Sequence, residues 1–365
     1  MAVKMADIAA DLNVSVVTVS KVLRNKGRIS ESTRQRVLQR CRELHYQPNL
    51  IARSLATRRT HTLGLLLPDF THPFFAQIAK SIAQTARARG YHVLISYFDE
   101  DPAIEISEAQ TLLARCVDGL ILASAQSHGR SEFFRMLARR RTPFVLIDRH
   151  VPGVRASFVG VDHVEIGRMA TTHLLEQGCR HIAHLRGPDL GIADDRLRGY
   201  RLAIEAYELR AIPDYVVDAG FQTQTGYDAM RAFLNPRIKL DGVFCYNDPI
   251  AVGAIKALRE SGHRVPQDVA VVGAGNVNYA DALEVPLTSI DQSPDEIGHE
   301  AAKLLLDQVE SESSRRRNRT VVVPHRLIVR ASTQRSSLRR GDLRPGRKLG
   351  TALRRTGVRV GRPPG

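Results

Sequence analysis

The sequence predicts an α/β protein in which a small all-α N-terminal domain precedes a bilobed core of two doubly wound parallel sheets. Three observations support this prediction. Apolar residues recur at helical spacing near the N-terminus, β-rich runs alternate with helical stretches from Thr62 onward, and the strands are too many for one sheet. At 365 residues, with 43% of them hydrophobic, the chain can bury more than one core.

The N-terminal pattern is that of two short helices joined by a tight turn and followed by a longer helix. The first is expected at Met5–Leu12, and Asn13 then tolerates the left-handed conformation that a tight turn requires. Ser15 stands at the N-cap of a second helix, Val16–Leu23, and a third follows at Glu31–Leu44. The buried stripe of this third helix is expected to be Val37, Leu38, Cys41 and Leu44. The order is that of a helix-turn-helix domain, and a generic three-helix bundle is the alternative.

A short linker follows the third helix. Pro48 ends that helix, and Asn49 can cap a new, short one. Leu50, Ile51 and Leu55 are apolar, but a helix of this length is not stable alone. The linker therefore needs a partner surface on which to fold.

Beyond the linker, strands and helices alternate in the pattern of parallel sheets covered by helices on both faces. The strands are expected at Thr62–Leu67, His92–Tyr97, Gly119–Ala123, Phe144–Ile147, Phe158–Val161, His181–Leu185, Val243–Tyr246, Val269–Val272 and Leu287–Ile290. The helices include Phe75–Arg89, Ile106–Arg115, Gly167–Gln177, Arg196–Tyr207, Gly226–Leu234 and Ile250–Ser261. A late strand, Thr320–Val329, carries Pro324 and is expected at an edge or a crossover.

The formal net charge of +15 is concentrated at the two ends of the chain. Residues 1–60 hold 12 Lys and Arg against 4 Asp and Glu, and residues 334–365 hold 10 against 1, so the stretch between them is close to neutral. A basic excess on a compact, patterned N-terminal segment favours a polyanionic partner such as DNA. The Arg-, Gly- and Pro-rich tail lacks an apolar face and is expected to be disordered, either simply solvated or adding nonspecific DNA affinity.

Several classes of protein are disfavoured by what the sequence lacks. It holds no run of 18 apolar residues and no hydrophobic signal region at the start, so we expect a cytoplasmic protein without membrane contact. The cysteines form no C-x-x-C pair, so neither a metal site nor a disulfide frame is expected. The motifs of nucleotide cofactor sites and hydrolases are missing too, so we expect no enzyme, no catalytic residue and no cofactor.

Taken together, the motifs resemble those of the lactose/galactose repressor (LacI/GalR) family of transcriptional regulators over residues 3–333. Near the N-terminus the resemblance rests on Asp7-Ile8-Ala9, Val14-Ser15 with Thr18-Val19-Ser20-Lys21-Val22-Leu23, and Tyr46-Gln47-Pro48-Asn49 with Ala52-Arg53-Ser54-Leu55. In the core it rests on Gly64–Pro68, Pro73-Phe74-Phe75, Val117-Asp118-Gly119, Val161-Asp162, Arg196 with Gly199-Tyr200, Asn247-Asp248 and Pro286-Leu287-Thr288. Each stretch is weak alone, but their order and spacing make the match specific.

The resemblance implies a periplasmic-binding-protein-like core and a homodimer, or a tetramer, that binds a pseudo-palindromic double-stranded operator under the control of a small-molecule effector, most often a sugar or a sugar derivative. The implied domains are a helix-turn-helix at 1–47, a hinge helix and linker at 48–60, a core at 61–333 and a basic disordered tail at 334–365. Within the core, lobe 1 is expected at about 61–158 and 291–319, and lobe 2 at about 159–290 and 320–333.

By the same resemblance, the second helix enters the major groove and the hinge folds as a helix in the minor groove, where Leu55 wedges into a base step. The implied DNA-binding residues are Ser15, Val16, Val17, Thr18, Ser20, Lys21, Asn25, Ala52, Arg53 and Leu55. Val16 and Val17 cannot hydrogen-bond to base edges, so the operator is expected to favour T·A pairs, whose methyl groups they can contact. Lys21 is a candidate guanine contact.

The effector is expected between the lobes, at loops that follow strands. The implied effector-binding residues are Phe74, Asp148, Arg149, Asp162, Arg196, Phe221, Asn247, Asp248, Gly275 and Gln292. Two positions depart from the family pattern, because relatives that bind sugars or purines usually have an aspartate where this chain has Gly275 and an asparagine where it has His72. An uncharged position holds a pair of sugar hydroxyls less strongly, so the class of effector stays open between neutral, acidic and phosphorylated sugars.

Two other functions compete with this interpretation. A periplasmic sugar-binding protein shares the core, but residues 1–57 and the lack of a signal region argue against it. A DNA-binding protein that responds to no effector is the second alternative, which the altered cleft positions leave open. The sequence does not fix the sign of control, since induction and corepression use the same parts.

Overall fold

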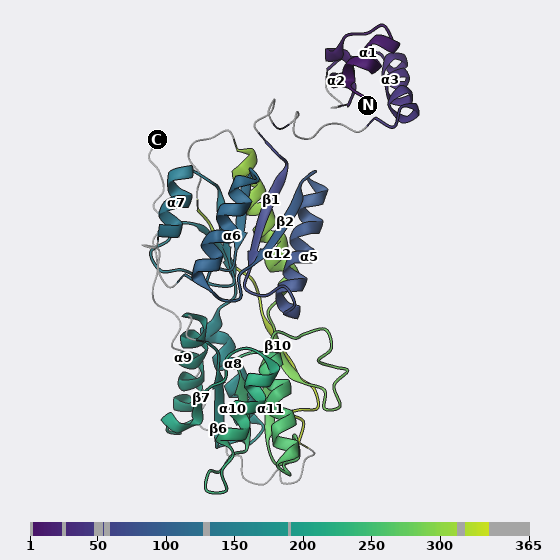
Figure 1. The fold of residues 1–365 in the computed structure, drawn as a ribbon. Helices are drawn as coiled ribbons and strands as arrows, with labels where there is room; N and C mark the ends of the chain where they lie inside the picture. The colour runs from purple at the N-terminus through teal and green to yellow at the C-terminus, as the bar shows by residue number, and fades with distance from the viewer. Residues whose placement is uncertain are drawn as a thin grey trace, which may run out of the picture. The chain divides into compact units, whose positions relative to one another are not determined.

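The computed structural model describes residues 3–23, 27–46, 54, 59–126, 132–188, 191–311 and 318–335. The chain divides into two compact units (Figure 1). Unit 1 comprises Met1–Ile166, Asp189–Arg196 and Asp291–Arg326, and unit 2 comprises Gly167–Pro188, Leu197–Ile290 and Leu327–Gly365. Within the described residues, every helix is too short or too polar to span a lipid bilayer.

Three helices form the N-terminal domain, and each agrees with its predicted range to within one residue. They are α1 (Met5–Asp11), α2 (Val16–Leu23) and α3 (Glu31–Glu43). Asn13 takes the expected left-handed conformation between the first two, with φ of 54°. Ser15 caps α2, since its Oγ accepts a hydrogen bond from the backbone N–H of Thr18 at 3.0 Å. These helices enclose a core of their own, formed by Ile8, Ala9, Val19, Val22, Val37 and Cys41.

One residue of the predicted N-terminal core lies at the surface. Leu38 was expected in the buried stripe of α3, but its side chain is 39% exposed. The buried positions Val37 and Cys41 are four residues apart, so they define the inward face of α3. Leu38 lies one residue, or about 100° of helix rotation, from Val37, at the rim of that face.

The sheet of unit 1 has six strands in the order β11-β5-β4-β3-β1-β2, and neighbouring strands are parallel. The strands are β1 (Thr62–Leu67), β2 (His92–Tyr97), β3 (Gly119–Leu122), β4 (Phe144–Ile147), β5 (Ser157–Gly160) and β11 (Thr320–Val322). Helices α6 (Pro102–Ala114) and α7 (Glu132–Arg140) cover one face of this sheet, and α5 (Pro73–Ala88) and α12 (Pro294–Glu310) cover the other (Figure 1).

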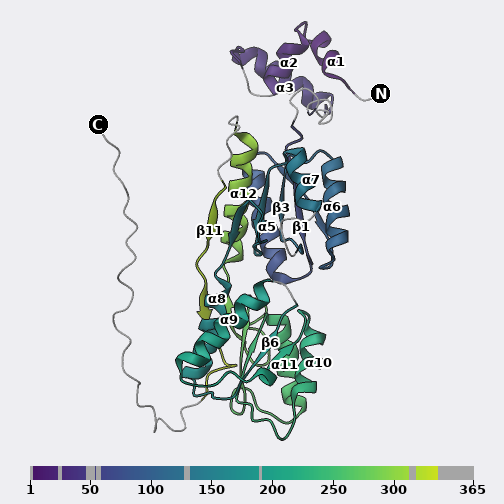
Figure 2. The ribbon, with the colours of Figure 1, turned by 90° about the vertical axis from the view of Figure 1, so that its left-hand side faces the viewer.

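The sheet of unit 2, seen from a second side in Figure 2, also has six strands, in the order β12-β10-β9-β8-β6-β7, and the strands from β10 to β7 are parallel to their neighbours. Its strands are β6 (Ile182–Arg186), β7 (Val216–Asp218), β8 (Gly242–Cys245), β9 (Ala270–Ala274), β10 (Thr288–Asp291) and β12 (Arg326–Ile328). The remaining helices are α8 (His163–Glu176), α9 (Gly191–Ala206), α10 (Thr223–Phe233) and α11 (Asp248–Glu260), with a 3₁₀ turn at Pro213–Tyr215. The predicted fold class, a helix-turn-helix followed by two doubly wound sheets, is confirmed.

The structure changes the expected boundaries between the lobes. Residues 159–160 and 320–322 were expected in lobe 2, but β5 and β11 both belong to the sheet of unit 1, where Val159 pairs with Val321. The crossovers therefore follow Gly160 and Val322. The expected strand Thr320–Val329 is divided at Pro324 into β11 and β12, each at the edge of its sheet, where a residue without a backbone N–H is tolerated.

Three elements were not among those expected, namely α7, α12 and β7. Strand β7 has only three residues and none of them is buried, so it lacks the alternating apolar signal of a half-buried strand. Helix α12 has 17 residues and forms much of the packing on one face of the unit 1 sheet. The basic tail was predicted at residues 334–365. Arg335, at its start, donates from Nε to the Pro266 carbonyl at 3.0 Å, and the residues from 336 onward lie outside the described residues.

Candidate DNA-binding and effector sites

Helix α2 separates its valines into two opposite faces. Val19 and Val22 are buried in the core of the N-terminal domain, whereas Val16 is 44% and Val17 61% exposed. The two exposed valines are adjacent and lie beside the exposed side chains of Ser15 and Lys21, so they offer a small apolar surface that a partner group can contact. The exposed face is therefore the surface on which α2 can meet DNA.

The polar residues predicted to bind DNA surround these two valines. The hydroxyls of Ser15 and Thr18 lie 2.9 Å apart, so Ser15 already uses part of its hydrogen-bonding capacity to begin α2. Lys21 is exposed, and its aliphatic stem lies over Gly27, where an added Cβ would come within 3.3 Å of its Cδ. Ser20 is half-buried. The other predicted DNA contacts, Asn25, Ala52, Arg53 and Leu55, lie outside the described residues.

Charged and polar side chains gather where the strands of the unit 1 sheet end. Parallel strands bring their carboxyl ends to one edge, so Glu100 beyond β2 and Asp148 and Arg149 beyond β4 lie at the same edge. The Arg149 guanidinium is held in a two-pronged pair by Glu100, with Nη1 donating to Oε2 at 2.5 Å and Nη2 to Oε1. Both side chains are largely buried, so the two charges neutralise each other away from water.

A hydrogen-bonded chain continues from this pair through buried residues. Arg196 Nη2 donates to Gln292 Oε1 at 3.0 Å and to His163 Nδ1 at 3.3 Å. Since Nδ1 accepts, the His163 proton sits on Nε2, which donates to the backbone oxygen of Asp148 at 3.1 Å. Burial lowers the pKa of His163 well below its ordinary value and the charge of Arg196 adds to this, so the imidazole is neutral. We call Glu100, Asp148, Arg149, His163, Arg196 and Gln292 the polar cluster.

The Asp148 carboxyl is the most available acceptor of the polar cluster. It lies 3.8 Å from His163 Nε2 and 3.8 Å from Arg149 Nε, and within the described part of the chain it accepts no hydrogen bond. Burial raises its pKa, which the charges of Arg149 and Arg196 partly counteract. A ligand hydroxyl can supply the missing donor at this carboxyl.

Two further residues of unit 1 that were predicted to bind the effector take part in packing and helix capping. Phe74 is buried against Phe75, with ring centroids 5.2 Å apart, so it belongs to the packing at the start of α5. Asp162 is exposed and its Oδ1 accepts from the N–H of Glu165 at 3.0 Å, which caps α8. His72, at the N-cap of α5, has its pKa lowered to about 4, chiefly by burial, so it too is neutral.

In unit 2, Asn247 and Asp248 are engaged by the protein itself. Asn247 caps α11, because its Oδ1 accepts from the N–H of Ile250 at 2.9 Å, and its Nδ2 donates to the Phe221 carbonyl at 2.8 Å. Asp248 is fully buried and accepts from Ser289 Oγ at 2.6 Å and from the N–H of Val277 at 2.8 Å. These contacts fasten the loop after β9 and leave Asp248 no surface for a ligand.

The departure at Gly275 has a structural explanation in the same loop. Gly275 has φ of 138°, a conformation that L-residues with side chains rarely adopt. A Cβ at the neighbouring Gly273 would lie 2.2 Å from Asp248 Oδ1. The loop is therefore built around the Asp248 carboxylate. Asn276, which follows, accepts from Arg330 Nη2 at 2.8 Å through its Oδ1.

The structure thus brings together Asp148, Arg149, Arg196 and Gln292 of the predicted effector residues, and it separately groups Asn247, Asp248, Phe221 and Gly275 in unit 2. Sequence reasoning missed Glu100 and His163. His163 follows the Val161-Asp162 motif directly, and Glu100 stands beyond a predicted strand, so both positions carried a usable signal. No group of residues suited to hold a metal ion occurs in the described ranges.

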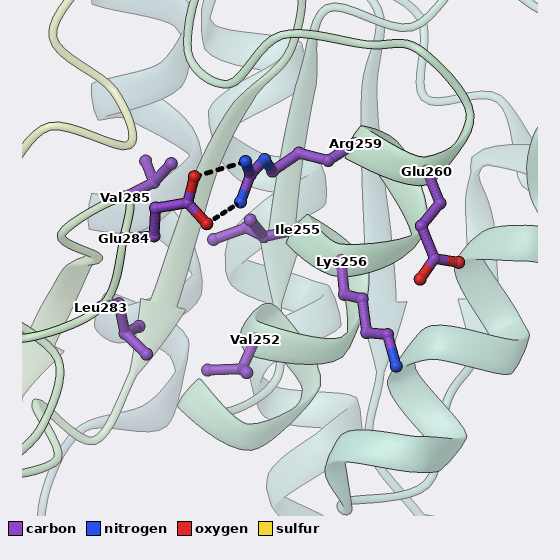
Figure 3. A pocket seen from close by; sticks show the side chains of 8 residues that line it. All are labelled: Val252, Ile255, Lys256, Arg259, Glu260, Leu283, Glu284 and Val285. Atoms are coloured by element: carbon purple, nitrogen blue, oxygen red, sulfur yellow. Dashed lines mark hydrogen bonds and ion pairs between the residues drawn. The ribbon is translucent and has the colours of Figure 1, made fainter.

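A separate groove lies on unit 2, and no predicted site residue lines it (Figure 3). Val252 and Ile255 of α11 face Leu283 and Val285 across it. Its rim is charged, with both signs present on Lys256, Arg259, Glu260 and Glu284. The Arg259 guanidinium is paired with the Glu284 carboxylate through two hydrogen bonds.

A helix-turn-helix with an exposed recognition face, carried by two parallel-sheet units with polar side chains at their strand ends, defines a DNA-binding regulatory protein with a ligand-sensing core. Comparison with known proteins gives the same class of protein. Residues 4–49 match the family model of bacterial regulatory proteins, lacI family, and residues 171–333 match that of the periplasmic binding protein-like domain.

The similarity to individual relatives extends over nearly the whole chain. The chain is 34% identical to the ribose operon repressor of Halalkalibacterium halodurans over 90% of its own length and 96% of the relative's, and 30% identical to the repressor CytR of Escherichia coli K12 over 91% and 97%. Among solved structures, the regulator CelR in complex with cellobiose has a TM-score of 0.68 at 32% identity, covering 90% of this chain and 99% of that one.

A second solved structure resembles the fold more closely. The lac repressor dimer bound to operator and the anti-inducer ONPF has a TM-score of 0.81 at 26% identity, covering 91% of this chain and 99% of that one. The chain belongs to the lacI family of bacterial regulatory proteins, and it is a transcriptional regulator rather than an enzyme.

The pair between Glu100 and Arg149 gives a first prediction. Glu100→Ala leaves the buried guanidinium without its carboxylate, so we expect a loss of about 3 kcal/mol in the free energy of unfolding of the core, measured by urea denaturation. Glu132→Ala is the control, because that carboxylate pairs with Arg135 and Arg139 at the surface and should contribute less than about 1 kcal/mol. Equal losses in the two variants would contradict a special role for the buried pair.

Proposed function

We propose that this protein is an operator-binding transcriptional repressor whose affinity for DNA is controlled by a sugar or a sugar derivative bound at the polar cluster. The observation that carries the proposal is the chain of hydrogen bonds Gln292–Arg196–His163–Asp148, which is buried at the carboxyl ends of parallel strands. The same polypeptide carries helix α2 of the helix-turn-helix, on which Val16 and Val17 are exposed. By analogy with its relatives, the protein works in the cytoplasm.

A neutral, hydroxyl-rich effector suits the polar cluster better than an anionic one. Glu100 compensates the charge of Arg149 and the carboxyl of Asp148 offsets that of Arg196, so the polar cluster has no excess positive charge to hold an acidic or phosphorylated ligand. Hydroxyls can donate to Asp148 and accept from the amide of Gln292 or the guanidinium of Arg196. Two similar solved structures support a neutral sugar as the effector. One is the complex of the regulator CelR with cellobiose, and the other is a LacI family regulator of Enterococcus faecium with bound ribose.

Ligand binding is tested by a thermal-shift screen of the full chain against neutral sugars, including D-ribose and cellobiose, sugar acids, sugar phosphates and nucleobases. A sugar at about a hundred times its Kd should add roughly 2.7 kcal/mol to the stability of the core and raise its Tm by a few degrees. Arg196→Ala should abolish the shift, whereas Arg201→Ala, an exposed arginine of the same helix α9, should keep it. A shift that survives Arg196→Ala would place the effector elsewhere, and no shift with any sugar would contradict the proposed ligand class.

DNA recognition is tested with an operator selected from random duplexes. We expect T·A pairs opposite Val16 and Val17, and replacing those thymines by deoxyuridine should weaken binding about fourfold per methyl, because burying one methyl contributes about 0.8 kcal/mol. The double variant Val16→Ser, Val17→Ser should bind both duplexes alike. Deoxyuridine placed outside these positions is the control. A selected operator without A/T preference there, or equal sensitivity of both proteins to the missing methyls, would count against the assignment.

We further propose that the protein acts as a homodimer and that the groove of Figure 3 contributes to the contact between the two copies. In a two-fold contact the same surface meets itself, so a rim that carries both Lys256 and Glu260 can pair each charge with its opposite on the second copy. The apolar floor supplies surface to bury. A dimer also fits a pseudo-palindromic operator, whose half-sites mirror the two-fold symmetry of the protein.

The dimer proposal is tested by sedimentation equilibrium. Val252→Asp and Leu283→Asp, which place a carboxylate on opposite walls of the groove, should each convert dimer into monomer. Leu202→Asp is the matched control, because Leu202 is an exposed leucine on α9. Dimers that persist in both groove variants, with unchanged melting temperatures, would assign the contact to another surface.

A further inference from the structure

Helix α12 connects the two parts of unit 1 that the proposed function requires. Its N-terminus follows Gln292, which accepts the hydrogen bond from Arg196 in the polar cluster. At its other end, the carbonyl of Val309 accepts a hydrogen bond from Arg59 Nη2 at 3.0 Å. Arg59 belongs to the segment that joins the N-terminal domain to β1. A helix of 17 residues is about 25 Å long, so α12 bridges the whole height of the sheet.

Arg59 contacts the last turn of α12, and the C-terminal end of a helix favours a cation. The last carbonyls of a helix lack partners within it, and the aligned peptide dipoles place partial negative charge there. The next residue is fastened as well, since the N–H of Thr60 donates to Asp118 Oδ1 at 3.0 Å and its Oγ1 to the Cys116 carbonyl at 2.8 Å. The linker thus enters unit 1 through two adjacent anchored residues, of which only Arg59 touches α12 in the described contacts.

The body of α12 is packed closely against α5 between these ends. A Cβ at Gly298 would lie 2.7 Å from the backbone oxygen of Ile78 on α5, so the two helices are in close backbone contact. Ser81 Oγ donates to the Asp295 carbonyl at 2.6 Å near the start of α12. Near its end, Arg89 pairs with Asp307 and Glu310. These contacts fasten α12 to α5 along its length, so the helix can shift as one rigid body.

We propose that α12 transmits the state of the polar cluster to the DNA-binding linker, and that Arg59 is the positioning residue that receives it. The inference rests on the proposed function. A ligand that draws Arg196 or Gln292 toward itself displaces the start of α12, the rigid helix moves the Val309 carbonyl, and Arg59 moves with its acceptor. The geometry of the linker, and with it the affinity for operator, then depends on a group about 25 Å away.

The test is a double-mutant cycle in the full chain, with the selected operator duplex as the probe and no ligand present. Operator Kd is measured by fluorescence anisotropy for the wild type, Gln292→Ala, Arg59→Ala and the double variant. Gln292→Ala should change Kd at least fivefold in the wild-type background and less than twofold in the Arg59→Ala background. Arg59→Lys should restore the effect of Gln292→Ala, since an ammonium can donate to the same carbonyl.

A matched control separates transmission from general damage. Lys303→Ala changes an exposed side chain in the middle of α12, so its effect should add to that of Gln292→Ala without coupling. Unchanged melting temperatures show that the variants are folded, and Gln292→Glu provides a second perturbation of the same contact with Arg196. Equal fold-changes in both Arg59 backgrounds, with operator binding retained, overturn the inference alone. A wild type without any operator preference overturns the proposed function and the inference together.

Discussion

The direction of the strands is the constraint on which the rest of unit 1 depends. Because neighbouring strands of its sheet are parallel, all their carboxyl ends lie at one edge and all their amino ends at the other. Glu100, Asp148 and Arg149 follow strands and so gather at the first edge, whereas Thr60 precedes β1 and is anchored at the second. The proposed ligand site and the linker are thereby separated by the height of the sheet, and any coupling between them has to run along the elements that span it.

The electrostatics of the polar cluster follow from its burial. Two arginines face two carboxyls, and both nearby histidines are neutral, since the pKa of His72 is lowered to about 4 and that of His163 further below its usual value. Because the pKa of His72 is lowered on folding, the unfolded chain binds a proton at this residue more readily than the folded protein does. The contribution of His72 to the free energy of unfolding is therefore fully present above about pH 6.5 and is lost as the pH falls toward 4. Around neutral pH these imidazoles keep one charge state, and the cluster presents the same face to a ligand.

Much of this architecture is readable in the sequence, and the exceptions have physical causes. The N-terminal helices were predicted to within one residue because caps such as Ser15 and the turn at Asn13 mark their ends. The residues at which the chain crosses between the sheets were not predicted correctly, because β11 pairs with β5, which is far away in the sequence. The role of Asp248 also depends on residues that are distant in the sequence. Its position in a motif suggests a ligand contact, but only the fold shows that Ser289 and Val277 occupy both of its oxygens.

The central claim is that one polypeptide couples a ligand at the polar cluster to DNA at α2. Thermodynamic linkage demands that this coupling be reciprocal. The most direct measurement is isothermal titration of the sugar identified by thermal shift into the full chain, with and without saturating operator duplex, beside operator affinity with and without saturating sugar. We predict that operator changes the Kd of the sugar by the same factor, between about 5 and 150, as the sugar changes the Kd of operator. A sugar Kd that is indifferent to operator would contradict the coupling.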